Sequence, residues 1–494
     1  MEKDEVFFLS ILTFITGIAL GSFFAPMFAP LFLLGGAFFL GAGTVFRSWN
    51  VFFFGCFMLV FLGGVVLASQ ARDMYQKLPV LTTTAAGTVR IVADPVEKDF
   101  FRNIVLRFES CESDVCPKTD VLWQAPLSFR GEAGTRLRFQ CQLELPKNFT
   151  PEFDYRMFLH KDGIGYVCPK ASAVQLLLPD RESFIRAALY VPKHVFEETL
   201  SRVLREPEAG LAKGLLLGGD NYLPRDLKDS FTRVGLSHMI AVSGYNITLI
   251  AQMLLSLGLI LGLWRKQSIW FALIGIVFFI VMIGLPASAA RAGTMASIVF
   301  LALQSGRLAR PVNALLFAGA AMLLLNPLLF RYDLGFQLSF LATLGILLLM
   351  PYYEHFSPKQ VILKKGGEIL FMTIAVELFV LPLILFSFHT FSPLIIIGNF
   401  LVVLVPFAMA ASFLAGIAFL IIPGAHVVFA WMALALLTIL TRSVEVLGTL
   451  TRVTVTVDSF GVWHLVGWYV ILGTLLWIAT KYFPLTRRSY EEKS

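Results

Sequence analysis

Polar side chains stand at the start of an apolar stretch in the run G-L-S-H-M-I-A-V-S-G-Y-N-I-T-L, residues 235–249. His238, Ser243 and Asn246 offer an imidazole, a hydroxyl and an amide, all of which bind ligands through hydrogen bonds. In hydrocarbon such groups cost free energy unless they face protein or water, so they mark a functional site by default. The alternative is a helix start at Gly244 whose small and polar residues pack against neighbouring helices.

Further polar residues interrupt later apolar stretches. Arg291 lies in G-L-P-A-S-A-A-R-A-G-T-M, and Asp333 and Gln337 lie in R-Y-D-L-G-F-Q-L-S-F-L-A-T-L-G. A charge at the bilayer centre costs about 2.5 to 3.5 kcal/mol, so Arg291 and Glu377 should face the protein interior or a hydrated cavity. Taken singly, each also fits a structural ion pair or a snorkelling side chain. Beside the helix-breaking S-G and G-L-P elements, the set favours a path between interrupted helices.

The sequence shows no arrangement typical of catalysis. Its seven histidines are scattered singly, without the His-x-His-x-Asp-His spacing of a dinuclear metal hydrolase. A Ser-His-Asp motif, a P-loop and a dinucleotide fingerprint are also missing. We therefore expect no catalytic residue, no metal, no cofactor and no nuclease activity in this polypeptide. A membrane-embedded enzyme with His238 and Asp333 as acid and base would lack a nucleophile or metal set.

The composition places the chain in a membrane. Hydrophobic residues make up 57% and charged residues 15% of its 494 residues, whereas soluble domains carry about 25% charged residues. The mean hydropathy is +0.75. The N-terminus lacks the basic region and cleavage site of a signal peptide, so its first apolar run predicts a retained span. The sequence therefore predicts a polytopic α-helical membrane protein.

Three apolar runs, 6–24, 27–46 and 51–69, are each close to the length of about 20 residues that a span needs. With the N-terminus inside, Arg47 also falls inside, and the polar region that follows the third run lies outside the cell membrane. Residues 72–182 hold fifteen Lys plus Arg and fifteen Asp plus Glu. This neutral balance does not indicate a basic nucleic-acid-binding face.

The polar region alternates apolar and polar residues over short runs with turn signals between them, which predicts a small antiparallel β-barrel or sandwich. It contains Cys111, Cys116, Cys141 and Cys168. An outside location permits disulfide bonds, and the four cysteines allow three pairings that the sequence does not distinguish. A zinc site is the weaker alternative because the paired C-x2-C clusters of a zinc ribbon are missing.

An amphipathic helical pattern follows from Arg181 to about residue 210. The remaining spans come quickly, and the basic loops between them fall mostly on one side. Four apolar stretches near the end are short and bounded by prolines, so we expect one of them to be re-entrant or interfacial. They are 394–408, 411–422, 427–440 and 462–478.

These patterns predict five regions. They are N-terminal transmembrane spans (1–70), an extracytoplasmic β domain inserted after the third span (71–180), an amphipathic helical linker (181–235), a transmembrane channel domain (236–482) and a cytoplasmic tail (483–494).

The motifs carry a family resemblance. The run L-L-L-G-G-D-N-Y-L-P-R-D-L-K-D-S-F-T-R-V-G-L-S-H-M-I-A-V-S-G-Y-N-I-T-L, followed by G-L-P-A-S-A-A-R-A-G and D-L-G-F-Q-L-S-F-L-A-T-L-G, closely resembles the competence domain of the ComEC family. The order of parts is similar too, and the resemblance implies an OB-like fold for the β domain. The resemblance is to a short form of the family, which is without the C-terminal metallo-β-lactamase-like domain that many members carry. Tyr245-Asn246-Ile247 stands where the family more usually has Leu-His-Val.

By this resemblance, the protein is expected to be an inner-membrane channel that admits single-stranded DNA during natural transformation. The expected partners are single-stranded DNA, the lipid bilayer, and a separate DNA receptor, nuclease and cytoplasmic motor; the oligomeric state stays open. We expect a hydrated path for DNA, since a polyanion in a bilayer needs donors and positive groups at intervals. Its lining comprises His238, Ser243, Gly244, Asn246, Arg291, Asp333 and Gln337.

Three other functions compete with this interpretation. A transporter of another polyanionic or lipid-linked substrate would show the same polar spans. The second function is a membrane-embedded enzyme. The third is a non-transporting scaffold that binds partners through its β domain. Uptake of labelled DNA separates the first of these from a DNA channel.

Overall fold

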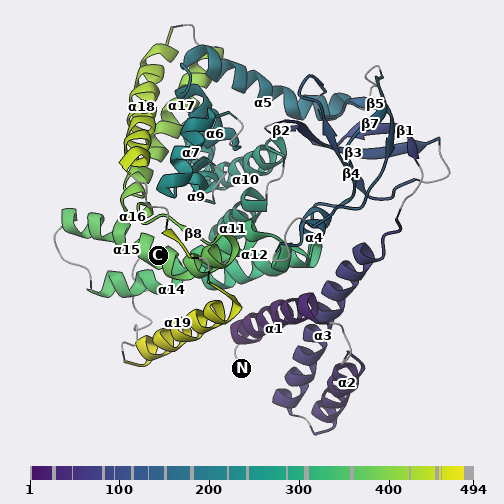
Figure 1. The fold of residues 1–494 in the computed structure, drawn as a ribbon. Coiled ribbons are helices and arrows are strands. Elements are labelled where there is room, and N and C mark those ends of the chain that lie inside the picture. Colours follow the sequence, from purple (N-terminus) through teal and green to yellow (C-terminus); the bar gives the residue numbers. More distant parts are fainter. Residues whose placement is uncertain are drawn as a thin grey trace. The chain divides into compact units, whose positions relative to one another are not determined.

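The computed structural model describes most of the chain, and the helices and strands are labelled in Figure 1. Helix side chains at 3–4, 183–190, 244–245, 287–288, 291, 299, 301–304, 361–365 and 450 are not described. The described residues are 3–24, 29–46, 48–80, 84–93, 95–98, 100–112, 116–131, 133–148, 153–177, 183–219, 222–240, 244–284, 287–304, 311–356, 361–421, 424–450, 455–457 and 459–482.

The chain forms two compact units, each described by itself. The first comprises 1–191 and 316–337, and the second comprises 192–315 and 338–494. Helices α12 (Pro311–Leu325) and α14 (Leu334–Phe356) contribute residues to both units.

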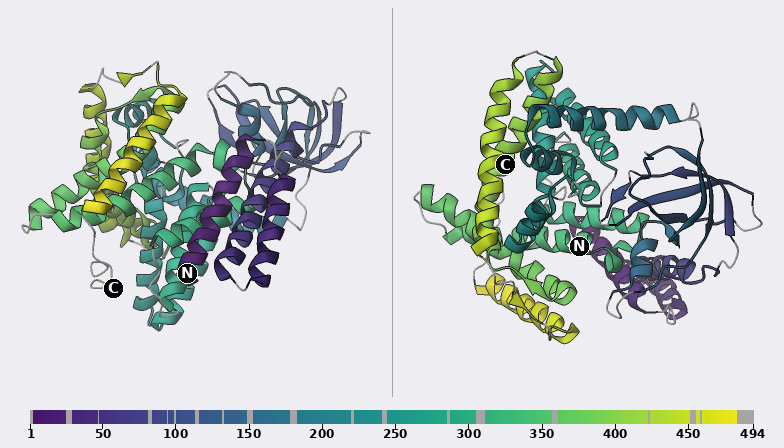
Figure 2. Two further views of the ribbon diagram at one scale, coloured as in Figure 1. Left: turned by 90° about the horizontal axis from the view of Figure 1, so that it is seen from below. Right: turned by 45° about the horizontal axis from the view of Figure 1, so that its top comes forward.

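The first unit begins with the helices α1 (Lys3–Phe23), α2 (Ala29–Val45) and α3 (Trp49–Gln76), drawn in purple (Figures 1 and 2). Helices α1 and α3 pack backbone against backbone. A Cβ added to Gly17 would lie 2.2 Å from the carbonyl oxygen of Phe61, and one added to Gly64 would lie 2.5 Å from that of Phe14. Small residues allow such close approach between membrane helices, where apolar burial drives little association.

The β domain follows α3. One sheet joins its strands in the order β6-β4-β3-β1-β5-β7, with β2 paired to β3. Along β1, buried residues such as Val89 and Ile91 alternate with more exposed ones, and they pack on Trp123 and Phe139 of neighbouring strands. The strands are β1 (Thr84–Ile91), β2 (Val96–Glu97), β3 (Arg102–Cys111), β4 (Asp120–Ala125), β5 (Arg136–Gln142), β6 (Ile164–Cys168) and β7 (Ala171–Leu176).

The sheet differs in two ways from an antiparallel barrel. Strand β6 pairs with β4 in parallel, because helix α4 (Tyr155–His160) lies in the connection that returns the chain to the same end of the sheet. The segment that follows β5 contacts β6 through a single bridge in the described residues, Glu144 to Val167. It forms no continuous ladder with β6 there. The prediction of a β domain after the third helix is therefore confirmed, whereas a closed barrel is not found in the described part of the chain.

Two disulfide bonds lie in this domain. One joins Cys111 to Cys116, with a Cα–Cα distance of 5.7 Å, and the other joins Cys141 to Cys168, at 6.2 Å. The second links β5 to β6, and both of its cysteines are fully buried in the core of the sheet.

Helix α4 holds the β domain against the end of α3. Nη2 of Arg156 donates to the carbonyl oxygens of Tyr75, at 3.1 Å, and Gln76, at 3.3 Å. These are among the last carbonyls of α3, which have no partner within the helix and attract a cation. His160 is buried and stacks on Tyr75, with ring centroids 4.7 Å apart.

The second unit is built around α6 (Glu208–Leu217), all of whose residues are buried. Its core includes apolar side chains of α7 (Arg225–Val234), α17 (Val405–Ile421) and α18 (His426–Leu450). The other elements are α5 (Ser183–Val203), α8 (Ser237–Ile240), α9 (Gly244–Ile260), α10 (Arg265–Met282), α11 (Ala287–Gln304), α15 (Val361–Phe388), β8 (Thr390–Phe391), α16 (Ile395–Gly398), η1 (Leu401–Leu404), β9 (Val455–Thr456) and α19 (Val462–Tyr482).

Residues 394–422 do not divide as the sequence predicted. The short helices α16 and η1 lead directly into α17, which begins at Val405 and continues without a break through residues 408–411. Pro406 does not interrupt the helix, because it lies in the first turn of α17. A backbone N–H at that position has no partner within the helix, so its absence removes no hydrogen bond. The two predicted stretches are therefore one continuous run.

Eight helical stretches of the described chain are long and apolar enough to cross a membrane. They confirm the predicted class, a multi-pass α-helical membrane protein with a small sheet domain. The stretches are 5–23, 49–76, 265–282, 334–356, 366–388, 395–421, 426–449 and 462–482, and shorter apolar helices occupy 29–45, 246–260 and 311–325.

We predict that the two disulfides contribute unequally to β-domain stability. Because the stabilisation grows with the length of the closed loop, the Cys141→Ala/Cys168→Ala variant should lose about 3.5 kcal/mol and Cys111→Ala/Cys116→Ala about 2 kcal/mol. Pulse proteolysis of the full chain in urea measures both losses. Equal losses would contradict the loop-length argument.

We also predict that the β domain loses stability in mild acid because of His160. Its Nδ1 lies 2.7 Å from the carbonyl oxygen of Ile164, while Nε2 accepts from Nε of Arg156. Burial lowers the pKa of His160 because it removes water from the charged imidazolium, and the positive charge of Arg156 lowers the pKa further. The folded state therefore binds fewer protons than the unfolded state, and stability should fall as the pH drops below about 6.5.

A His160→Gln variant should lose this part of the pH dependence. Stability of the unchanged and variant chains is compared by thermal unfolding between pH 7.5 and pH 5, values chosen to bracket the ordinary pKa of histidine at about 6.5. Parallel curves for the two proteins would show that His160 is not responsible.

Candidate functional site

Asn246 lies in the second unit, on α9, and its side chain is 2% exposed. Nδ2 of Asn246 donates to the carbonyl oxygen of Leu215, at 3.1 Å. Leu215 is in the last turn of α6, whose carbonyls lack partners within the helix. The amide thus satisfies a buried helix end, so Asn246 has a structural task at the point where α6 meets α9.

His238 lies on the short helix α8, with an exposed side chain whose Nδ1 is 3.3 Å from the carbonyl oxygen of Gly235. Gly235 ends α7 in the left-handed conformation, at φ 84°, and the N–H of Leu236 donates to the carbonyl of Phe231. This is the Schellman arrangement, which glycine adopts without strain. The sequence V-G-L therefore turns the chain sharply at the end of α7 and leads it into α8, which carries His238.

Arg291 belongs to α11, which packs against α9. Ala289 and Ala292 of α11 join Ile247 and Ala251 of α9 in one apolar cluster. The helix that carries Arg291 is thus a neighbour of the helix that carries Asn246. The side chain of Arg291 and the whole of Ser243 lie outside the described residues, and Gly244 is the first residue of α9.

Asp333 and Gln337 lie in the first unit, at the start of α14. Oδ1 of Asp333 accepts the N–H of Phe336, at 2.8 Å, and Oδ2 lies 3.2 Å from Nζ of Lys161. Nε2 of Gln337 donates to the carbonyl oxygens of Phe330 and Arg331, at 2.8 and 3.0 Å. Both side chains therefore organise the turn that precedes α14.

The predicted site residues thus fall into two groups. His238, Gly244, Asn246 and the backbone of Arg291 belong to the second unit, on α8, α9 and α11. Asp333 and Gln337 belong to the first unit.

The sequence interpretation missed a polar cluster around Lys213, which is buried on α6. Its Nζ donates to Oγ of Ser201, at 3.0 Å, and to Oε1 of Glu206, at 3.1 Å. The ammonium also lies 5.6 Å from the ring centroid of Tyr222. A lysine within an otherwise apolar helical run was the available signal, because a buried charge requires a partner.

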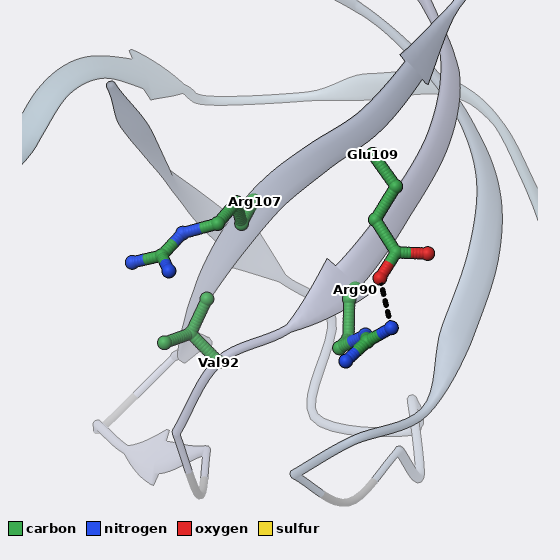
Figure 3. A pocket seen from close by; sticks show the side chains of 4 residues that line it. All are labelled: Arg90, Val92, Arg107 and Glu109. Atoms are coloured by element: carbon green, nitrogen blue, oxygen red, sulfur yellow. Dashed lines mark ion pairs between the residues drawn. The ribbon is translucent and has the colours of Figure 1, made fainter. Parts of the chain in front are cut away.

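Arginines line a shallow cavity of about 180 Å³ on the β domain, shown in Figure 3. The strand register places Arg107, Arg90 and Arg136 opposite one another on β3, β1 and β5. Glu109 pairs with both Arg90 and Arg136, and Arg107, which points away from that pair, holds Asp120 at 2.7 Å. Two carboxylates thus offset most of the positive charge of this row. Over the described residues, no group of three His, Cys, Asp or Glu side chains is placed to hold a metal ion.

Comparisons with known proteins identify the family of the chain. Residues 215–482 match the family model described as Competence protein. A curated relative, ComE operon protein 3 of Bacillus subtilis (strain 168), is 24% identical over 296 residues, which cover 60% of this chain and 35% of that protein. The chain thus aligns with about a third of that relative's length, and no solved structure matches.

The family model spans more than half of the chain and includes α8, α9, α11 and the start of α14, which carry the predicted site residues. The resemblance read from the motifs is therefore confirmed: the chain belongs to the Competence protein family.

Proposed function

We propose that this protein is a channel in the bacterial cytoplasmic membrane that passes single-stranded DNA into the cytoplasm during natural transformation. The observation that carries the proposal is the match of residues 215–482 to the Competence protein family. The apolar helices within this range support a membrane location. The name of the Bacillus subtilis relative, ComE operon protein 3, supports the same process.

The proposed path runs beside α8, α9 and α11 and is lined by His238, Ser243, Gly244, Asn246 and Arg291. The exposed side chain of His238 supports a contact with passing DNA, because an imidazole can donate a hydrogen bond to a phosphate. A few donors and cations are sufficient for a path, since tight phosphate sites would stop the strand from moving. We propose separately that Asp333 and Gln337, at the start of α14 in the first unit, contact DNA.

The β domain lies outside the cytoplasm in this proposal and has an OB-like fold. The strand order β6-β4-β3-β1-β5-β7 and the parallel β4–β6 pair support such a fold. Because Glu109 and Asp120 offset the arginine row, we assign this domain a docking or structural task ahead of phosphate binding. A separate DNA receptor, nuclease and motor complete the process, and this polypeptide contributes no catalytic step.

The proposal predicts that loss of the gene abolishes DNA entry. A transformable bacterium without its own gene of this family should take labelled DNA into a nuclease-resistant, cytoplasmic state only when this chain is supplied. Chromosomal integration and protected label are both measured. Normal entry without the chain would refute the DNA channel, and entry that remains absent with an inserted chain would favour another polyanionic or lipid-linked substrate.

A negative charge at His238 should repel DNA. We expect His238→Glu to lower uptake by about tenfold or more, because like charges in a confined site cost over a kcal/mol, and His238→Gln to have a smaller effect. His464→Glu, at another exposed histidine of the second unit, is the matched control. Equal uptake in the His238→Glu and His464→Glu strains would remove His238 from the path.

The charge of Arg291 should matter more than its size. Arg291→Ala should lower uptake strongly in a protein that still inserts, whereas Arg291→Lys should keep part of it because the cation is retained. Membrane insertion is verified by immunoblot of the membrane fraction. Full uptake by the alanine variant would show that Arg291 has no contact with DNA.

A further inference from the structure

The turn between α12 and α14 connects two other parts of the first unit. It includes α13 (Leu329–Tyr332) and runs from Asn326 to Asp333. Oδ1 of Asn326 accepts the N–H of Leu328, at 3.2 Å, which folds the start of the turn on itself. The turn lies far along the chain from α1 and from the β domain, both of which it contacts.

On one side the turn binds the β domain at the end of α4. Nδ2 of Asn326 donates to the carbonyl oxygen of Lys161, at 2.6 Å. Nζ of Lys161 lies 3.2 Å from Oδ2 of Asp333, and each of these side chains is 9% exposed. The same ammonium lies 4.6 Å from the ring centroid of Phe158 and 3.0 Å from Oδ1 of Asp162, whose side chain is 51% exposed.

On another side the turn binds the end of α1. Nη1 of Arg331 donates to the carbonyl oxygen of Ser22, at 2.7 Å, and the guanidinium lies 4.5 Å from the ring centroid of Phe23. Ser22 is in the last turn of α1, where unpaired carbonyls and the helix dipole favour a cation. The turn is therefore fixed to both α1 and the β domain.

The two oxygens of Asp333 perform different tasks. Oδ1 accepts the N–H of Phe336 and so caps the first turn of α14, while Oδ2 pairs with Lys161. A buried ion pair adds little net stability over an apolar pair, but removal of one partner leaves the other charge uncompensated. Such a pair therefore specifies one arrangement of its two elements more than it strengthens them.

We infer that Asp333 is a positioning residue that, with Lys161, latches the β domain to the turn from which α14 begins. The site joins the region before residue 215 to the family domain, because Lys161 lies outside the matched range and Asp333 lies inside it. A displacement of the β domain thus bears directly on the capped end of α14. This role rests on contacts within the first unit and does not depend on the proposed function.

Asp333→Asn separates the two tasks of the carboxylate. Asparagine caps a helix about as well as aspartate, so the start of α14 is retained while the ion pair is lost. Asp162→Asn is the matched control, since it removes the other, more exposed carboxylate beside the same ammonium. Hydrogen–deuterium exchange of the purified full chain is measured at residues 157–164 and 329–337.

The latch predicts that Asp333→Asn speeds exchange about tenfold at 157–164, a segment that is distant in sequence. Asp162→Asn should change the exchange rate of that segment little. Lys161→Gln should in turn speed exchange at 329–337. In a cycle with the Lys161→Gln/Asp333→Asn double variant, the two effects should be non-additive. The inference would be overturned if each substitution sped exchange only in its own segment. Equal effects of Asp333→Asn and Asp162→Asn would also overturn it, as would additive effects in the cycle.

Discussion

The structure depends on one constraint: in a chain this apolar, every buried helix end must find its partners within the protein. The carbonyls that end α6 receive the amide of Asn246, those of α3 receive Arg156, and those of α1 receive Arg331. The start of α14 is capped by Asp333. Where water does not reach such an end, a missing partner would cost several kcal/mol, so each of these caps also fixes where one element meets another.

This constraint bears on the polar residues that the sequence singles out. Asn246, Asp333 and Gln337 are conspicuous in a sequence because they interrupt apolar runs, and each has a helix end or turn carbonyl to satisfy. His238 differs, because among the described residues its exposed imidazole has the carbonyl of Gly235 as its hydrogen-bond partner, at a long 3.3 Å. An exposed polar side chain on α8 is the better candidate for contact with a moving ligand.

Much of the fold was predictable from local patterns. Apolar length indicated the helices, and period-two alternation with turn residues indicated a β domain after the third helix. The parallel β4–β6 pair was not predictable, because strand order depends on which distant strand α4 brings back to the sheet. The continuous run at 395–421 differs from the predicted division into 394–408 and 411–422, because Pro406 lies in the first turn of α17, where a helix accepts proline.

The candidate site was predictable only in part. Its motifs named the family and marked Asn246 and Asp333, but no spacing in one sequence could join Asp333 to Lys161, 172 positions earlier. The K-D-G segment at 161–163 reads as a simple turn, so its buried lysine gave no signal. Tertiary partners of this kind decide whether a polar residue serves the fold, the ligand or both.

The path beside α9 is tested most directly by photo-crosslinking during DNA entry. A photoreactive amino acid is placed at position 238 or, as a control, at position 464 of the full chain in transforming cells. The account predicts that labelled incoming DNA crosslinks at 238 and that crosslinking at 464 stays at background. Efficient entry with no more crosslinking at 238 than at 464 would contradict it.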